Sequence, residues 1–187
     1  MSVGSQVVDA MKKLAEHRFE DAVVTASVAL SATARLEYPA DGDKAACRKF
    51  LEHNLPIISK IGWVAFGVSQ PINFLYRRLD SKAPGISVRT MPEMLYDIVR
   101  CKAVHEAVLP ENLLFTELPM IQTGLNGELV LPIDVIYGLL LAIVGSPSNA
   151  DEHADGDPVF SFGGKSIRVN DLWGEREKIA TFIGATA

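Results

Sequence analysis

The chain has 187 residues, of which 48% are hydrophobic and 22% are charged, and its net charge at pH 7 is −5. This length favours a single domain over residues 1–187, and the negative charge argues against a protein that coats nucleic acid non-specifically. The two isolated cysteines, Cys47 and Cys101, form no C-x-x-C pair and are typical of a reduced cytoplasmic protein. Neither a signal peptide nor a membrane-spanning segment is expected.

Apolar residues recur mostly at three- and four-residue steps in the first half of the chain, and this periodicity predicts helices. The predicted fold is mainly α, a helical bundle with a core over about residues 3–145 and two short β-hairpins in the C-terminal half. An apolar run at residues 57–66 contains Gly62, which leaves its state open. In the first half, helices are expected at residues 3–16, at 18–37, at 44–53 after an aspartate cap, and at 72–79.

The C-terminal half combines hairpin signals with one very apolar segment. Asn126-Gly127 lies between residues 120–123 and 128–131 and predicts the first hairpin. Residues 133–144 lack a polar face, so this helix is expected to be buried within the bundle or at a subunit interface. The second hairpin and a final helix, capped by Asn170 or Asp171, are expected over about residues 158–184. That hairpin should turn at Gly163-Gly164, with Phe160, Phe162, Ile167 and Val169 on one face.

The segment at residues 90–108 predicts a well-marked helix. Thr90 and Glu93 have the spacing of a capping box, and Pro92 falls in the first turn, where its missing N–H is tolerated. Arg100 and His105 come later in the same segment. An arginine and a histidine on one element can bind a phosphate and transfer a proton.

Residues 95–106, Leu-Tyr-Asp-Ile-Val-Arg-Cys-Lys-Ala-Val-His-Glu, resemble the helix that carries the R-x4-6-H motif of HEPN-superfamily proteins. The order of expected helices over residues 18–55 is also similar to bacterial HEPN-like proteins. With residues 90–107, the resemblance covers about half of the chain.

The resemblance implies a metal-independent endoribonuclease that acts as a homodimer, in a toxin or defence setting. Arg100 and His105 would be the catalytic residues, and Lys102, Tyr96 and Glu106 are the candidate substrate-binding residues. The alternative for Lys102 and Glu106 is an ion pair between them, and the alternative for Tyr96 is packing against the bundle. The implied substrate is RNA, and no cofactor or metal is implied. In such a family two copies of the helix meet across the dimer and form one composite site.

Helical geometry places Arg100 and His105 about 140° apart around the axis and roughly 7.5 Å apart along it, so they need not touch within one subunit. The alternative interpretation is that Arg100 pairs with Asp97, that His105 is a surface residue, and that the protein is a catalytically silent HEPN-like binding or assembly module. Cys101 directly follows Arg100, where many nucleases of the family have a polar residue, and this favours the alternative. Residues 77–102 hold six cations against three acids, which is enough for a local phosphate site.

Two further motifs predict ordinary structure rather than a site. Residues 151–157 form an acidic loop that lacks the glutamate an EF-hand requires at its twelfth position, so a solvated loop is expected. Gly164-Lys165-Ser166 lacks the earlier glycine of a phosphate loop and is predicted to be a hairpin turn. His17 and His53 have no partners at metal-ligand spacing and are predicted to be structural.

Overall fold

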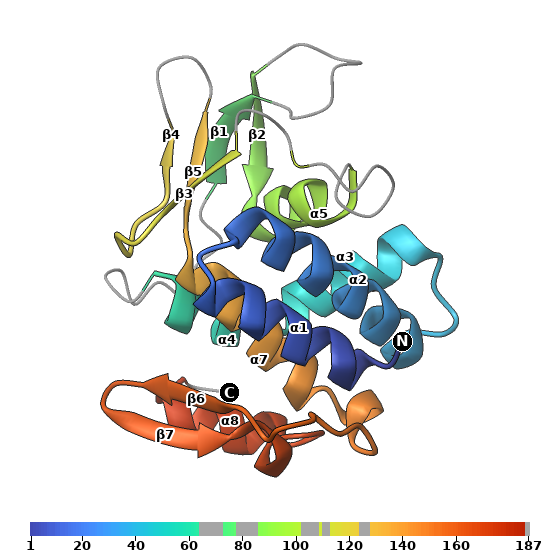
Figure 1. Cartoon of the computed structure of the whole chain (residues 1–187). Helices are drawn as coiled ribbons and strands as arrows, with labels where there is room; N and C mark the ends of the chain where they lie inside the picture. The colour runs from blue at the N-terminus through green and yellow to red at the C-terminus, as the bar shows by residue number, and fades with distance from the viewer. Residues whose placement is uncertain (64–72, 78–85, 102–108, 110–112, 124–127, 186–187) are drawn as a thin grey trace.

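The computed structural model describes residues 1–63, 73–77, 86–101, 109, 113–123 and 128–185. Within these residues the fold is mainly α with small sheets, as predicted (Figure 1). None of the described helices is long and apolar enough to cross a membrane.

Helices α1 (Val3–Ala15) and α2 (Phe19–Glu37) form a packed helical pair at the N-terminus. The hydroxyl of Ser2 accepts a hydrogen bond from the N–H of Ser5 (3.1 Å) and caps α1. The carboxylate of Glu152, far along the chain, accepts two more bonds, from the N–H groups of Val3 (3.3 Å) and Gly4 (2.7 Å). The first turn of α1 is therefore fixed to the C-terminal part of the protein.

Helices α3 (Asp43–His53) and α4 (Leu55–Gly62) continue the bundle. Cys47, Phe50 and Leu51 on α3 are fully buried. The predicted aspartate cap of α3 is wrong, because the residue before the helix is Gly42 and no side chain caps it. Helix α4 shows that the apolar run is helical over residues 57–62, and its part from residue 64 on lies outside the described residues.

Strands β1 (Asn73–Arg77) and β2 (Ile86–Thr90) form an antiparallel pair in which Asn73 is opposite Thr90. The helix predicted at residues 72–79 is therefore wrong over the described part. Aromatic residues favour a pleated strand, and Phe74 and Tyr76 lie in β1. Pairing with residues 9–17 positions further along the chain completes the preference for strand.

A second sheet has the order β3-β5-β4 and contains β3 (Leu113–Thr116), β4 (Gln122–Thr123) and β5 (Leu129–Pro132). Strands β4 and β5 are antiparallel and lie on the two sides of the predicted Asn-Gly turn, which is outside the described residues. Strand β3 runs parallel to β5, a pairing that was not predicted.

Helix α7 (Asp134–Gly145) is the central element of the bundle. Every residue from Leu139 to Gly145 is buried, and α7 packs against α2 and α4, which confirms the predicted burial. A Cβ atom added at Gly138 would lie 2.9 Å from the Cα atom of Ile58. The glycine thus permits the close approach of α7 to α4.

The C-terminal part contains the short 3-10 helices η1 (Pro147–Asn149) and η2 (Val169–Asp171), strands β6 (Val159–Phe162) and β7 (Lys165–Arg168), and helix α8 (Arg176–Ile183). The second hairpin is confirmed. Phe160 is opposite Ile167, and Ser161 is opposite Ser166, which is the predicted division of faces. Helix α8 packs against α4 and α7 and joins this part to the bundle.

The predicted cap of the last helix is wrong. Helix α8 begins only at Arg176, and Asn170 has other partners. Its side-chain oxygen accepts hydrogen bonds from the N–H of Ala154 (2.8 Å) and from the indole of Trp173 (3.1 Å). Its amide nitrogen donates to the carbonyl of Ala154 (3.0 Å), so Asn170 fixes a loop instead of a helix.

Candidate functional site

Helix α5 (Met91–Cys101) follows β2 without a break and carries the predicted Arg–His segment. The Glu93 carboxylate accepts a hydrogen bond from the backbone N–H of Thr90 (3.1 Å), which is one half of the predicted capping box. Pro92 is the second residue of the helix. The predicted start of this helix is confirmed.

The inner face of α5 is apolar and buried. Met91, Met94 and Leu95 are at most 2% exposed. Figure 1 shows α5 between the β1–β2 pair and helices α2 and α3, on which it packs. On its other side, half-buried Glu93 forms an ion pair with Arg48 of α3. Apolar contact and ion pair together fix the rotation of α5 about its axis.

Tyr96, a predicted substrate-binding residue, is only 9% exposed. The ammonium group of Lys44 on α3 lies 5.9 Å from the centroid of its ring. A base can stack on an aromatic ring only where the ring face is open to solvent. In this structure Tyr96 packs against the bundle.

The backbone of Arg100 lies in the last turn of α5. His105, Lys102 and Glu106 lie outside the described residues, so the placement of Arg100 relative to His105 stays a prediction. In the first half of α5, Glu93 and Tyr96 each meet a cation of α3: Arg48 pairs with Glu93, and Lys44 lies over the ring of Tyr96.

A polar cluster that the sequence did not predict joins the ends of three helices. At the end of α2, both carboxylate oxygens of Glu37 accept hydrogen bonds from Nη2 of Arg176, at the start of α8 (2.9 Å each). Their side chains are 13% and 20% exposed. The hydroxyl of Ser146, just after α7, donates to Oε2 of Glu37 (2.5 Å). We call these three residues the helix clasp.

The end of α3 completes the surroundings of Arg176. Its Nε donates to the side-chain oxygen of Asn54 (3.1 Å), and its Nη1 lies 3.3 Å from Nε2 of His53. The Nδ1 atom of His53 lies 3.0 Å from the hydroxyl of Tyr38, at the end of α2. Every described contact is used to join helices, so the cluster is structural, as predicted for His53. No sequence spacing could have revealed it, because its members lie up to 139 residues apart.

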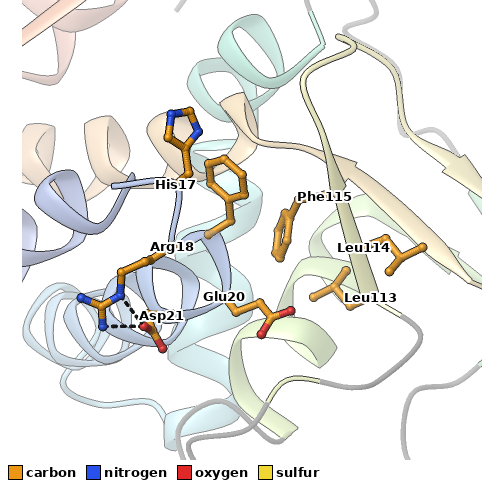
Figure 2. A pocket seen from close by; sticks show the side chains of 8 residues that line it. His17, Arg18, Glu20, Asp21, Leu113, Leu114 and Phe115 are labelled. Atoms are coloured by element: carbon orange, nitrogen blue, oxygen red, sulfur yellow. Dashed lines mark hydrogen bonds and ion pairs between the residues drawn. The ribbon is translucent and has the colours of Figure 1, made fainter. Parts of the chain in front are cut away.

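A pocket of about 400 Å³ lies between the turn that joins α1 to α2 and strand β3 (Figure 2). Helix α1 ends in a Schellman motif, in which the N–H of His17 donates to the carbonyl of Leu14 (3.0 Å) and that of Arg18 donates to Lys13 (2.9 Å). This motif requires a left-handed residue, and His17 has φ +58° where glycine is usual. The pocket is lined by His17, Arg18, Phe19, Glu20, Asp21, Leu113, Leu114 and Phe115.

The charged groups of this pocket are not all engaged. Arg18 donates to Asp21 through Nε (2.8 Å) and Nη2 (2.6 Å) and also pairs with Glu16 (3.2 Å). The hydrogen bonds to Asp21 are the main reason why the pKa of Arg18 lies above its ordinary value. Figure 2 shows this ion pair on one side and the Glu20 carboxylate directed toward β3.

Two carboxylates of the acidic loop, those of Glu152 and Asp157, have structural contacts. Glu152 caps α1, and Asp157 accepts a bond from the N–H of Asn170 (3.3 Å) and pairs with Arg168 (3.5 Å). No group of three or more metal-ligating side chains with suitable geometry occurs among the described residues.

Comparison with known proteins gives a family relationship. A sequence model of the family described as Rv1289 matches residues 2–187. No curated protein and no solved structure matches the chain significantly.

Proposed function

The chain belongs to the Rv1289 family, and we propose that it is a HEPN-like, metal-independent endoribonuclease that acts as a homodimer. Arg100 and His105 are the proposed catalytic residues, and RNA is the proposed substrate. The proposal rests on the Arg–His motif of residues 95–106 and on the way in which α5 is held.

The observation that carries the proposal is the docking of α5. Met91, Met94 and Leu95 fix its inner face, and the Glu93–Arg48 ion pair fixes its outer side. Position 100 follows Glu93 by seven residues, which is close to two helical turns, so its backbone lies on the side of Glu93. A catalytic residue requires a rigid support of this kind, because small displacements greatly reduce the rate.

In the proposed reaction, a histidine removes the proton of a ribose 2′-hydroxyl, which attacks the neighbouring phosphorus. The bond to the 5′-oxygen of the next nucleotide breaks, and the leaving oxygen receives a proton. His105 would transfer protons, and Arg100 would stabilise the charge on the phosphate. The products are a 2′,3′-cyclic phosphate and a 5′-hydroxyl end. Lys102 and Glu106 are proposed to contact the substrate, and the burial of Tyr96 supports a packing role for this residue.

The test is cleavage of labelled single-stranded RNA by the purified full chain. Cleavage should persist in EDTA and yield 2′,3′-cyclic phosphate ends, and DNA should remain intact because it lacks the attacking hydroxyl. His105→Ala should reduce the rate by about 10²–10⁴-fold. Arg100→Ala should be similarly damaging, and Arg100→Lys should not restore a bidentate phosphate contact.

Matched controls come from exposed residues of the same types. His153→Ala and Arg168→Ala should cleave at the rate of the unmodified protein, because both positions are exposed and remote in sequence from α5. Equal cleavage by His105→Ala would contradict the proposed site. Sedimentation should give a dimer, because the composite site needs two copies of the helix. A monomer at micromolar concentration would contradict the dimer.

A second candidate, a catalytically silent HEPN-like binding or assembly module, is favoured by a specific observation. Tyr96 is buried, and Glu93 and Arg48 are engaged with each other, so these three polar groups of α5 and α3 serve the bundle. Cys101 directly after Arg100 also fits this candidate. Absence of cleavage across varied RNAs, together with a stable dimer, would establish the module over the nuclease.

The proposed setting is the cytoplasm, in a toxin or defence role. The resemblance to HEPN proteins supports the role. A buried free thiol at Cys47 supports a reducing compartment.

A further inference from the structure

The pocket between the α1–α2 turn and β3 has no role in the proposed RNA cleavage. We propose that it binds an organic ammonium group, carried either by a free small amine or by a methylated lysine of a peptide. Three observations lead to this ligand: inclined aromatic rings, an unpaired carboxylate, and a local excess of acids.

The aromatic rings come from two separate elements. Phe19 of α2 and Phe115 of β3 have centroids 6.3 Å apart and planes inclined by 53°. The ring of His17 meets Phe19 edge-on, at 5.7 Å and 80°. An ammonium group is attracted to the electron-rich face of an aromatic ring, and inclined rings can offer more than one face to the same cation. Both phenylalanines are half-buried against the core, so their positions are held.

The charge of the pocket selects a cation. Arg18 is neutralised by Asp21 and Glu16. Glu20 is exposed and has no ion pair or hydrogen bond within the part of the chain that the structure describes. Figure 2 shows its carboxylate on the side of β3 on which Leu113 and Phe115 lie. One carboxylate therefore remains to pair with a ligand, and an anionic ligand would be repelled.

The position of the two acidic residues of the pocket has a second explanation, which accounts for only part of the site. Glu20 and Asp21 lie in the first turn of α2, where carboxylates interact favourably with the helix dipole. The dipole does not account for aromatic rings converging on the same place. It also does not explain why a histidine occupies the left-handed position of the turn, since a strained residue of this kind often marks a functional site.

The size of the pocket fits a small group. A volume of about 400 Å³ lies in the range of small-molecule sites. Leu113 is buried at its wall, and Leu114 is 48% exposed next to it. These leucines provide apolar contact for the methyl groups or the alkyl chain that accompany the ammonium.

The experiment is a ligand titration of the full chain followed by NMR. Choline is compared with its neutral isostere 3,3-dimethylbutan-1-ol. A trimethyllysine peptide is compared with the same peptide in which neutral norleucine replaces the trimethyllysine. We expect each cation to bind at least about tenfold more tightly than its neutral counterpart. Tighter binding of choline identifies a free amine as the source of the group, and tighter binding of the peptide identifies a lysine.

Three variants locate the site. Glu20→Gln and Phe115→Leu should each raise the dissociation constant by about tenfold, because one removes the carboxylate and the other a ring face. Glu117→Gln, an exposed carboxylate just after β3 and outside the lining, is the matched control and should leave binding unchanged. Thermal unfolding of each variant establishes that it is folded.

The proposal is overturned if the neutral compounds bind as tightly as the cations. It is also overturned if Glu20→Gln and Glu117→Gln weaken binding equally, because the general negative field of the protein would then explain the affinity. Failure of both cations to saturate the folded protein at about 10 mM would exclude the site as well.

Discussion

The helix clasp predicts a large loss of stability from one substitution in a largely buried ion pair. Arg176→Gln removes the cation that donates two hydrogen bonds to the carboxylate of Glu37. Glu37 is only 13% exposed, so the unpaired carboxylate stays largely out of water. Breaking a buried ion pair from one side costs about 3–5 kcal/mol, and the partial exposure of Arg176 favours the lower end. We expect a loss of about 3 kcal/mol in the free energy of unfolding.

The matched control is Arg168→Gln at the exposed ion pair with Asp157. Here the distance is 3.5 Å and the arginine side chain is 70% exposed, so the expected cost is below about 1 kcal/mol. Urea unfolding followed by circular dichroism measures both variants. In thermal unfolding, Arg176→Gln should lower the midpoint by about 6–12 °C, since 1 kcal/mol corresponds to about 2–4 °C at this chain length.

A double-mutant cycle separates the pair from its surroundings. Glu37→Gln alone should also lower the free energy of unfolding. In the Arg176→Gln background the same change should lower it by less, because it then removes a buried carboxylate that has lost its cation. Losses for Arg176→Gln and Arg168→Gln that agree within about 0.5 kcal/mol would refute the reasoning. Strict additivity in the cycle would show that the two side chains are not coupled.

Three further predictions concern single positions in the bundle. Gly138→Ala should destabilise the protein by about 1–3 kcal/mol in urea unfolding, since the added methyl meets the backbone of Ile58; the usual stabilisation of a helix by alanine would contradict the close approach. Thr90→Ala should cost about 1 kcal/mol through loss of the helix cap, and unchanged stability would contradict that role. Burial raises the pKa of the Cys47 thiol, so the thiol of the unfolded chain loses its proton first, and the free energy of unfolding should fall as the pH rises above about 8.5. Cys47→Ala should reduce this dependence of stability on pH. An equal dependence in the variant would refute the role of Cys47.

The sequence allowed prediction of elements whose signals are local. The start of α5 was predicted because Thr90, Pro92 and Glu93 are neighbours in the chain, and their interaction needs nothing distant. The β6–β7 hairpin was predicted because Gly163-Gly164 sets the turn and the alternation around it sets the faces. In both cases the decisive contacts join residues a few positions apart.

The errors occurred where a distant partner decides the structure. Residues 73–77 form a strand because they pair with β2, and local periodicity did not reveal this pairing. Strand β3 has a parallel partner, for which no short turn gives a signal. The pocket of Figure 2 was missed for the same reason, since Phe19 and Phe115 are 96 positions apart in the sequence. The predicted Arg–His site is a different case. The structure describes the backbone of Arg100 on α5 but not His105, so the site stays a prediction.

Contacts at the ends of α1 and α2 show most clearly how distant residues decide the structure, and they lead to one more prediction. Glu152 caps α1 from 148 residues away, and Arg176 binds the end of α2 from 139 residues away. Both contacts join the N-terminal helical pair to the C-terminal part, which sequence patterns had set apart as a hairpin and helix. Unfolding the C-terminal part would expose the first turn of α1 and leave Glu37 without its cation. We therefore expect a single cooperative unfolding transition in a Trp63→Phe variant, with the same midpoint by circular dichroism and by the fluorescence of Trp173, which is then the remaining tryptophan. Separate midpoints would mean that these contacts do not couple the two parts.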